Sequence, residues 1–440
     1  MGIIDNLLFA VFLAIGFGFF IRNCKKIIRN INLGKEIDRS DNSSLRWKNM
    51  AMIALGQSKM VKRPLAGILH IVVYVGFILI NIELLEIIID GLFGTHRVLS
   101  IMGSFYQIVI GSFEILAFLV LVAVIIFWFR RNLSNIKRFL SADLKGWAKQ
   151  DANNILYFEM ALMTLFLVMN ASDLHLNINS YDHYNVSFTA PISQFIQPIF
   201  DGMDFQTVAL IERVSWWLHI VGILVFLNYL YYSKHLHILL AFPNTYYADL
   251  NAKGKMDNLE SVTKEVKLML DPNMAFAAST ETEAPAKFGA SDVFDLNKIQ
   301  LLNAYTCTEC GRCTSVCPAN QTGKKLSPRK IMMDTRDRLE EVGKNIDLNQ
   351  GTFVNDNKAL LNDYISPEEL WACTTCNACV EECPVNISPL SIILDMRRYL
   401  VMEQSAAPVE LNGMMTNIEN NGAPWPYNQM DRLNWKNELL

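Results

Sequence analysis

The sequence Cys307-Thr-Glu-Cys310-Gly-Arg-Cys313-Thr-Ser-Val-Cys317-Pro318 decides the fold of the C-terminal part of this 440-residue chain. Its cysteine spacing returns in Cys373-Thr-Thr-Cys376-Asn-Ala-Cys379-Val-Glu-Glu-Cys383-Pro384. Such spacing is typical of proteins with two [4Fe-4S] clusters, in which the fourth cysteine of each run binds the cluster of the other run. We therefore predict two clusters with crossed ligation. The first set of ligands is Cys307, Cys310, Cys313 and Cys383, and the second is Cys373, Cys376, Cys379 and Cys317.

Two other uses of these cysteines are conceivable, a disulfide scaffold and a pair of zinc sites. Disulfide scaffolds belong to small secreted chains, and this chain is not small. Tetrahedral zinc sites are built from paired knuckles and need no fourth cysteine followed by proline. Both alternatives explain the two matched runs less well than iron-sulfur clusters do. The ninth cysteine, Cys24, has no partner in the sequence, and we predict no role for it.

The composition indicates a membrane protein with a region in a reducing compartment. Hydrophobic residues make up 51% of the chain and charged residues only 19%. The formal net charge of -4 gives no indication of a nucleic-acid partner. The first apolar stretch lacks the flanks of a cleavable signal peptide. Because cluster thiolates persist where thiols stay reduced, we expect the cysteine region in the cytoplasm.

Five apolar stretches are long enough to span a bilayer. They are Ile3–Ile21, Leu65–Ile89, Phe105–Phe129, Ile155–Ala171 and Val214–Tyr232. The loops 22–63 and 130–154 carry eleven and six Lys or Arg residues, whereas 173–207 carries none. The positive-inside rule therefore places the N-terminus outside and the C-terminal clusters inside. We expect a multi-pass protein of the cell inner (cytoplasmic) membrane.

The histidines of the membrane half predict a b-type haem, which needs two imidazoles at the same depth on facing helices. His70 lies near the inner end of the second span and His237 at the inner end of the fifth. We predict that these two residues bind one haem. The alternative is that they are interfacial or hydrogen-bonded inside the bundle.

A second haem is a further prediction. His219 precedes His237 by 18 residues, which on one continuous helix is five turns, or roughly 27 Å, along the same face. His219 would then lie toward the outer side, with His96 as its preferred partner and His175 as the other candidate. On the same helix His235 would face elsewhere. We take His175 and His183 as solvated loop residues. One or two haems remain open at this point.

Acidic residues also lie within the spans. Glu83, Glu86 and Asp90 form one stripe toward the outer end of the second span. Buried acids in membrane proteins often mark proton relays, so Glu83 and Glu86 are candidates for a proton exit near a quinone site. Solvation of a long helix end explains the stripe equally well.

The membrane half resembles a known family of cytochromes. The segments Arg63-Pro64-Leu65-Ala66-Gly67-Ile68-Leu69-His70, Trp216-Trp217-Leu218-His219 and Ser233-Lys234-His235-Leu236-His237 resemble the membrane b-type cytochromes related to the nitrate reductase gamma subunit. That family has five spans, an outer N-terminus and a last-span histidine pair five turns apart. Its second span supplies two histidines, whereas this chain has only His70 there and Ile80 ten residues later.

The cysteine region resembles the ferredoxin subunit of heterodisulfide reductase, in Tyr305-Thr306-Cys307-Thr308-Glu309-Cys310-Gly311-Arg312-Cys313 and in Trp371-Ala372-Cys373-Thr374-Thr375-Cys376. The whole chain is similar to membrane iron-sulfur oxidoreductases related to heterodisulfide reductase. Some of these are proposed to link electron-transfer flavoprotein to menaquinone. The resemblance implies two [4Fe-4S] clusters, one or two b haems, and menaquinone or ubiquinone as substrate.

We predict a mostly α fold, with a five-helix transmembrane bundle followed by an α-helical dicluster ferredoxin domain. The predicted regions are a cytochrome b-like membrane domain at 1–240, a cytoplasmic helix and linker at 241–292, the dicluster domain at 293–404 and a docking tail at 405–440. Helices are expected at Asn251–Leu270, Val293–Ala304, Arg329–Val342 and Pro389–Glu403, with another starting at Ser366-Pro367. A linker is expected at Asp271–Ser291.

In fused relatives, a segment like the tail leads into a cysteine-rich domain with a CCG signature. We therefore expect that domain on a separate subunit, with electron-transfer flavoprotein as a second candidate partner. The predicted function is electron transfer between a cytoplasmic partner, the clusters, b haem and membrane quinone. The chain would be an oxidoreductase subunit whose catalytic centre lies on a partner. The alternatives are a haem-free membrane ferredoxin and a dicluster assembly factor for a respiratory complex.

Overall fold

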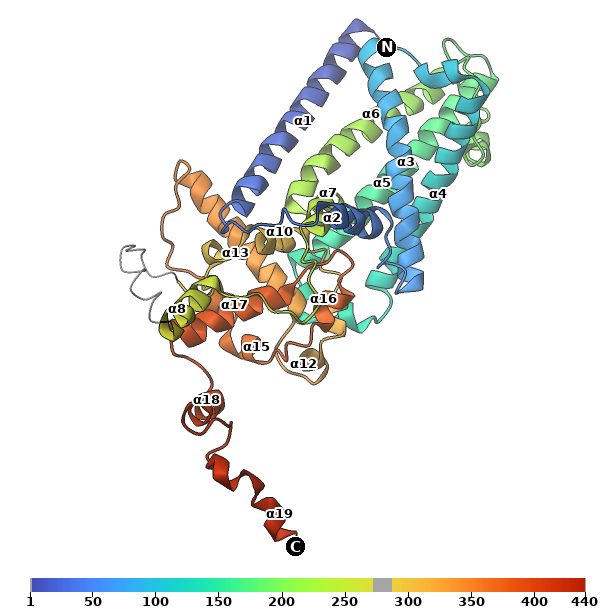
Figure 1. Cartoon of the computed structure of the whole chain (residues 1–440). Coiled ribbons are helices and arrows are strands. Elements are labelled where there is room, and N and C mark those ends of the chain that lie inside the picture. The colour runs from blue at the N-terminus through green and yellow to red at the C-terminus, as the bar shows by residue number, and fades with distance from the viewer. Residues whose placement is uncertain (1, 272–286, 440) are drawn as a thin grey trace.

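The computed structural model describes residues 2–271 and 287–439, and within them it contains helices and no named strand. Five helices are long and apolar enough to cross a membrane (Figure 1). They are α1 (Ile3–Ile31), α3 (Pro64–Phe93), α4 (Ser104–Asn132), α5 (Trp147–Ile178) and α6 (Phe205–Tyr229). The five predicted spans are confirmed, although each helix except α6 extends past both predicted ends or past one of them. Helices of this length exceed the roughly 30 Å hydrocarbon core of a bilayer.

Large apolar side chains face outward along the bundle. Ile4 is 74% exposed in α1, Ile68 is 59% exposed in α3 and Ile108 is 68% exposed in α4. In water such a surface would be unfavourable by about 25 cal/mol per Å² of apolar area. Lipid removes that cost, and the chain is therefore a membrane protein.

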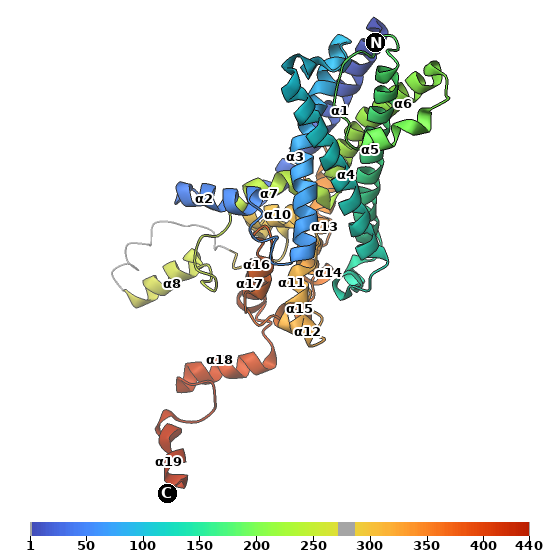
Figure 2. The ribbon, with the colours of Figure 1, turned by 90° about the vertical axis from the view of Figure 1, so that its right-hand side faces the viewer.

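Short helices lie across the end of the bundle nearest the cysteine region. They are α2 (Ser43–Met50), the π-helix η1 (Ala51–Leu55) and α7 (His237–Tyr246). Figure 2 shows α2 lying across the direction of α3. The side chain of Arg46 is 1% exposed and donates to the carbonyls of Tyr246 (3.2 Å) and Ala248 (2.9 Å). This arginine therefore ties α2 to the end of α7.

The cysteine region packs against this layer. Its helices are η10 (Val293–Asp295), α10 (Lys298–Thr306), α11 (Arg312–Ser315), α12 (Pro318–Gln321), α13 (Pro328–Leu348), α14 (Leu360–Asp363), α15 (Pro367–Trp371), α16 (Ala378–Glu382) and α17 (Pro389–Met402). The remaining elements are η2 (Val98–Met102), η3 (Lys137–Phe139), η4 (Ala142–Leu144), η5 (Ser193–Phe195), η6 (Gln197–Phe200), η7 (Leu230–Tyr232), η8 (Lys234–Leu236), α8 (Glu260–Leu270), α18 (Val409–Asn421), η11 (Gln429–Leu433) and α19 (Trp435–Glu438).

Most predicted helix starts of this region are confirmed, and two are wrong. Ser366 begins α15 with the predicted capping box to Glu369. The expected helix Val293–Ala304 is divided, because the Asn297 side chain accepts hydrogen bonds from two backbone amides and starts α10 anew. The helix expected from Asn251 begins only at Glu260, after a turn in which Gly254 has φ +94°. The linker predicted at 271–291 lies mostly outside the described residues.

The last membrane helix does not continue to His237, as the sequence predicted. The helix α6 ends at Tyr229, a 3-10 turn follows, and Ser233 is extended (φ -113°, ψ 145°). The Asp151 carboxylate stabilises the break, since it accepts hydrogen bonds from the Tyr229 hydroxyl (2.7 Å) and the Lys234 amide (3.1 Å). A new helix, α7, then starts at His237.

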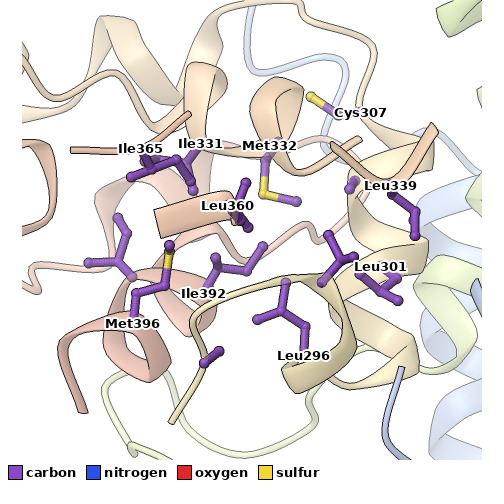
Figure 3. Packing of buried hydrophobic residues seen from close by; sticks show 14 of the residues in the cluster. Leu296, Leu301, Cys307, Ile331, Met332, Leu339, Leu360, Ile365, Ile392 and Met396 are labelled. Carbon is purple, nitrogen blue, oxygen red and sulfur yellow. The ribbon is translucent and has the colours of Figure 1, made fainter. Parts of the chain in front are cut away.

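One hydrophobic core joins the two halves of the molecule. Leu301, Ile331, Leu339, Ile392 and Met396 form its centre and are fully or almost fully buried (Figure 3). The same cluster includes residues of the membrane half, at the inner ends of α1 and α6 and in η8: Ile27, Leu230 and Leu236. The cysteine region is thus packed on the bundle rather than tethered to it.

Ion pairs reinforce this contact. Arg329 of α13 is 1% exposed and binds Asp143 of the loop between α4 and α5 through two nitrogens (2.5 and 3.0 Å). It also donates to the Arg138 carbonyl at 3.0 Å. On the other side, Lys26 of α1 pairs with Asp347 at 2.6 Å.

Replacing Arg329 by methionine should destabilise the protein, because it leaves the Asp143 carboxylate buried without its charge partner. Breaking a buried pair in this way costs about 3–5 kcal/mol. We expect a lower unfolding temperature in detergent and faster proteolysis between the two halves. The matched control is Lys325→Met, which removes a pair with Glu368 whose members are both more than 60% exposed and should leave the unfolding temperature unchanged. Equal shifts for the two variants would contradict the role of the buried pair.

Candidate cofactor sites

The two cysteine runs adopt the same backbone conformation. In the first run Glu309 (φ 54°) and Gly311 (φ 71°) are left-handed, and in the second run Thr375 (φ 55°) and Asn377 (φ 59°) are left-handed at the matching positions. Gly311 is required for a second reason, since a Cβ there would lie 2.6 Å from the Arg329 guanidinium. Left-handed turns at these positions curl the chain around the cysteine side chains.

Short helices present the remaining cysteines. Cys313 lies in α11 and Cys379 in α16, while Cys317 and Cys383 stand at helix boundaries followed by proline. Proline at the first helical position starts α12 directly after Cys317. Each run therefore bends away after its fourth cysteine.

The structure brings the fourth cysteine of each run to the other run. Cys383 lines one cavity together with Cys307, Cys310 and Cys313. Cys379 also borders this cavity, so the two sites lie close together. On the other side, burial raises the pKa of Cys373, and the nearby Cys317 and Cys376 raise it further. This is the grouping that crossed ligation requires.

The cysteines fit clusters better than other uses. All nine are free of disulfides. In the described residues, no three His, Cys, Asp or Glu side chains are close enough to hold a single metal ion. A cubane cluster places each thiolate on a different iron, so its ligands need not converge on one point.

The electrostatics require a metal for these thiols to ionise. Burial raises the pKa of Cys307 to about 12 and that of Cys383 to about 11. At neutral pH such thiols are protonated unless iron displaces the proton. Backbone amides also point at the sulfurs, from Thr375 to Cys373 (3.4 Å) and from Ile387 to Cys383 (3.3 Å). Such bonds tune cluster potentials.

Replacing Cys317 by serine should damage the second cluster and spare the first, although Cys317 belongs to the first run. We expect electron paramagnetic resonance of the reduced protein to lose the signal of one cluster, and iron analysis to show the loss of up to about four irons. Cys24→Ser is the matched control and should change neither measurement. Loss of the first cluster alone would contradict crossed ligation.

Two histidines meet where the membrane half joins the cysteine region. The ring centroids of His70 and His237 are 6.5 Å apart, with the ring planes at 43°. With metal–imidazole bonds of about 2 Å, two rings on one iron have centroids about 6 Å apart. His237 Nδ1 lies 3.1 Å from the Lys234 carbonyl, which leaves its Nε2 available to a metal. His70 Nδ1 is buried without a hydrogen-bond partner in the described residues. The pair therefore fits a haem iron.

His235 lies beside this pair, which sequence reasoning missed. Its ring centroid is 5.4 Å from that of His237, and its Nε2 is 3.7 Å from Glu159. Burial lowers the pKa of His235 to about 3, so the ring stays neutral. The break after Tyr229 turns this residue toward His237, whereas a continuous helix would turn it away.

The predicted pair of His219 and His96 is not formed. His219 Nδ1 contacts the Leu162 carbonyl at 3.0 Å, whereas His96 contacts Asp173 at 3.4 Å. These two partners are about 16 Å apart along α5, so one iron cannot bind both histidines. No other imidazole contacts that of His219 in the described residues. The structure thus offers paired ligands for one haem rather than two.

Two further predictions concern polar residues of the far end. His175 is not a solvated loop residue but is 5% exposed in α5, beside the Gln197 amide at 2.8 Å. Glu83 and Glu86 are each 3% exposed in α3, so they are buried rather than solvated at a helix end. His183 is exposed, as expected.

Arg312 connects the first cysteine site to the histidine pair. It lines the cavity of Cys307 and donates to the carbonyls of Lys59 (3.1 Å) and Met60 (3.4 Å), just before α3 begins. His70 lies in the second turn of that helix. Asn244 of α7 donates to the Val385 carbonyl (2.7 Å), two residues after Cys383. Both helices that carry the histidines are thus bonded to the loops of one cysteine site.

Comparisons with known proteins agree with this geometry. Residues 306–387 match the family described as 4Fe-4S dicluster domain. The protein named probable iron-sulfur-binding oxidoreductase FadF, from Bacillus subtilis, is 31% identical over 464 residues, covering 99% of this chain and 61% of that protein. The chain named EtfAB:quinone oxidoreductase, from Syntrophomonas wolfei, is 26% identical over 92% of this chain and 55% of that protein.

A third relative belongs to an archaeal enzyme. It is an iron-sulfur relative within the ferredoxin/F(420)H(2)-dependent CoB-CoM heterodisulfide reductase of Methanosarcina acetivorans, and it is 32% identical over 27% of this chain and 60% of its own length. This chain is a relative of iron-sulfur oxidoreductases and of heterodisulfide reductase subunits. It spans about 60% of the length of the curated relatives that it matches over most of its length. No solved structure matches.

The predicted family resemblance and fold class are therefore confirmed. The chain carries a helical 4Fe-4S dicluster domain after five candidate membrane helices. Electron transfer with iron-sulfur clusters follows from this domain and from the relatives.

Proposed function

We propose that this chain is a membrane electron-transfer subunit. It passes electrons between a partner, two [4Fe-4S] clusters, one b haem and membrane quinone. The observation that carries the proposal is the juxtaposition of His70 and His237 beside the cysteine site that Arg312 joins to α3. A cluster and a bis-histidine haem placed side by side make a one-electron path into the membrane.

The proposed ligands are those of the crossed arrangement. Cys307, Cys310, Cys313 and Cys383 would hold the first cluster, and Cys373, Cys376, Cys379 and Cys317 the second. His70 and His237 would hold the haem. The protein's own contribution is to fix these side chains and to surround them with hydrogen-bond donors and burial that set the potentials.

Exposure orders the two cysteine sites. Cys376 is exposed, whereas Cys307 and Cys383 are buried between the cysteine region and the bundle. The second site therefore faces the solution and suits exchange with a partner, and the first site lies next to the histidines. Direction along this path is from partner to quinone, as for oxidation of a substrate outside the bilayer.

The orientation of the chain follows from its loops. Basic residues are concentrated in 22–63 and 130–154, at the same end of the bundle as the cysteine region. By the positive-inside rule this end faces the cytoplasm, and the membrane is the cell inner membrane. Reducing conditions there favour the clusters.

The partner would be a cysteine-rich subunit of the heterodisulfide reductase type, with electron-transfer flavoprotein as the second candidate. The names of the relatives support these choices, and one relative's name includes quinone as substrate. The helices α18 and α19 have no buried residues and project from the body in Figures 1 and 2. Trp425, Met430 and Trp435 are exposed there. This arm is the proposed docking surface.

The haem is tested by the visible spectrum of the dithionite-reduced protein. We expect a b-type α band, with about one haem per chain by pyridine haemochrome. His237→Ala should lower the haem content at least about tenfold, because the iron loses one axial bond, and should leave the cluster signals in place. The matched control, His183→Ala, changes an exposed imidazole and should keep the haem.

A protein with full clusters and no b band would be a haem-free membrane ferredoxin. A b band that survives His237→Ala unchanged would place the haem elsewhere. If the purified chain also lacked the cluster signals, the assembly-factor alternative would replace both.

A further inference from the structure

Six carboxyl groups are buried at the end of the bundle opposite the cysteine region, where α3 ends and α4 begins. We name this set the far-end carboxyl cluster. Its members are Glu83, Glu86 and Asp90 of α3, Glu114 of α4, Asp173 of α5 and Glu212 of α6, each at least nine-tenths buried. The guanidinium groups among them are those of Arg97 and Arg213.

Five of the six carboxyl groups have donors that suit their ionised or shared form. The donors are Arg97 Nε to Asp173 (2.7 Å), the Arg97 amide to Asp90 (2.7 Å), the Leu99 amide and Tyr106 hydroxyl to Glu86 (2.9 and 3.0 Å), the Ile192 amide to Glu114 (2.8 Å), and the Tyr184 hydroxyl and Arg213 to Glu212 (2.8 and 2.5 Å). Backbone amides and guanidinium groups thus stabilise most of the negative charge.

Glu83 is the exception. Its Oε2 is buried and has no hydrogen-bond partner in the described residues. The charged groups that face it are Arg97, Glu86 and Glu114. Since the Arg97 side chain already binds Asp173, an ionised Glu83 would be a buried charge with two like charges nearby. Such a charge is costly, and the group binds a proton instead.

A small polar cavity connects this region with the far side. Its volume is about 40 Å³, room for a few water molecules, and its wall includes Glu86, His96, Arg97, Asp173 and Glu212. Asp173 Oδ1 and His96 Nδ1 lie buried there without a partner in the described residues. Polar atoms that need donors or acceptors in a cavity of this size suit bound water. Thr95, which also lines the cavity, is exposed at its rim.

We propose that Glu83 holds a proton and exchanges it, through the water of this cavity, with the solution on the side opposite the clusters. The inference rests on the proposed function for its redox step. A quinone that gains two electrons from the path takes up two protons, and quinol oxidation releases them. Glu83 carries one of these protons in either direction, and Glu86, Asp90 and Asp173 with Arg97 keep the outer part of the route charged and hydrated.

The consequence is that electrons and protons meet from opposite sides of the membrane. Electrons arrive from the end of the bundle that carries the cysteine sites, and protons from the end that carries the far-end carboxyl cluster. Each turnover would therefore move charge across the bilayer.

The first arm of the test asks for the proton itself and does not depend on haem or quinone. Infrared difference spectra between water and D2O at neutral pH should show the band of a protonated carboxyl group. Glu83→Gln should remove one such band, and Glu83→Asp should restore one. The control Glu410→Gln changes an exposed acid of α18, ionised at this pH, and should leave the bands unchanged. A spectrum of Glu83→Gln that keeps every band overturns the proposal.

The second arm measures the side. The full chain is reconstituted in vesicles with a trapped pH dye, and its orientation is set by protease digestion of the cysteine region. Quinol added to oxidised protein should release protons on the side without the clusters. Glu83→Gln should slow this release about 100-fold while dithionite still reduces the haem. Proton release on the cluster side overturns the proposal. A missing b band, by contrast, counts against the proposed function and leaves the first arm to decide.

Discussion

The ammonium group of Lys234 connects the bundle to the first cysteine run. It is 8% exposed and pairs with the carboxylate of Glu309, which lies between Cys307 and Cys310 and also binds Arg336 at 2.7 Å. Its backbone is bound to Asp151 of α5 and accepts from His237. Burial lowers the pKa of Lys234, while that of Glu309 is raised by burial but lowered overall by Arg336 and Lys234. One residue thus sets both the turn before His237 and the loop of the first cluster.

A buried pair of this kind costs desolvation and is weak support for stability. Its value here is register. Without it the first cysteine loop and the start of α7 would be held by apolar packing, which is less directional. The pairs of Arg329 with Asp143 and of Lys26 with Asp347 act at two other points of the same contact. Together with the shared hydrophobic core, they fix the distance from the cysteine sites to the histidines, and electron transfer depends on that distance.

Much of this organisation could be predicted from sequence, because it is written in local patterns. The cysteine spacing and the five apolar stretches require only counting, and depth alone pairs His70 with His237. The break at Ser233 could not be read from local pattern, since the Asp151 carboxylate that stabilises it comes from another helix. That break explains why the sequence places His235 on the wrong face. The pairing of His219 with His96 failed for a similar reason, since the partner of His96 is Asp173, far along the chain. Glu83 stands out in the sequence as an acid within a span, but its lack of a donor depends on how Arg97 is used elsewhere.

The central claim is that His70 and His237 share one iron beside the first cluster. Near-infrared magnetic circular dichroism of the oxidised protein reports the axial ligands of a ferric haem directly. The structure predicts a low-spin haem with two imidazole ligands, with about one such haem for every two clusters in the same sample. A haem with any other axial pair, or a protein with both clusters and no low-spin haem, would contradict it.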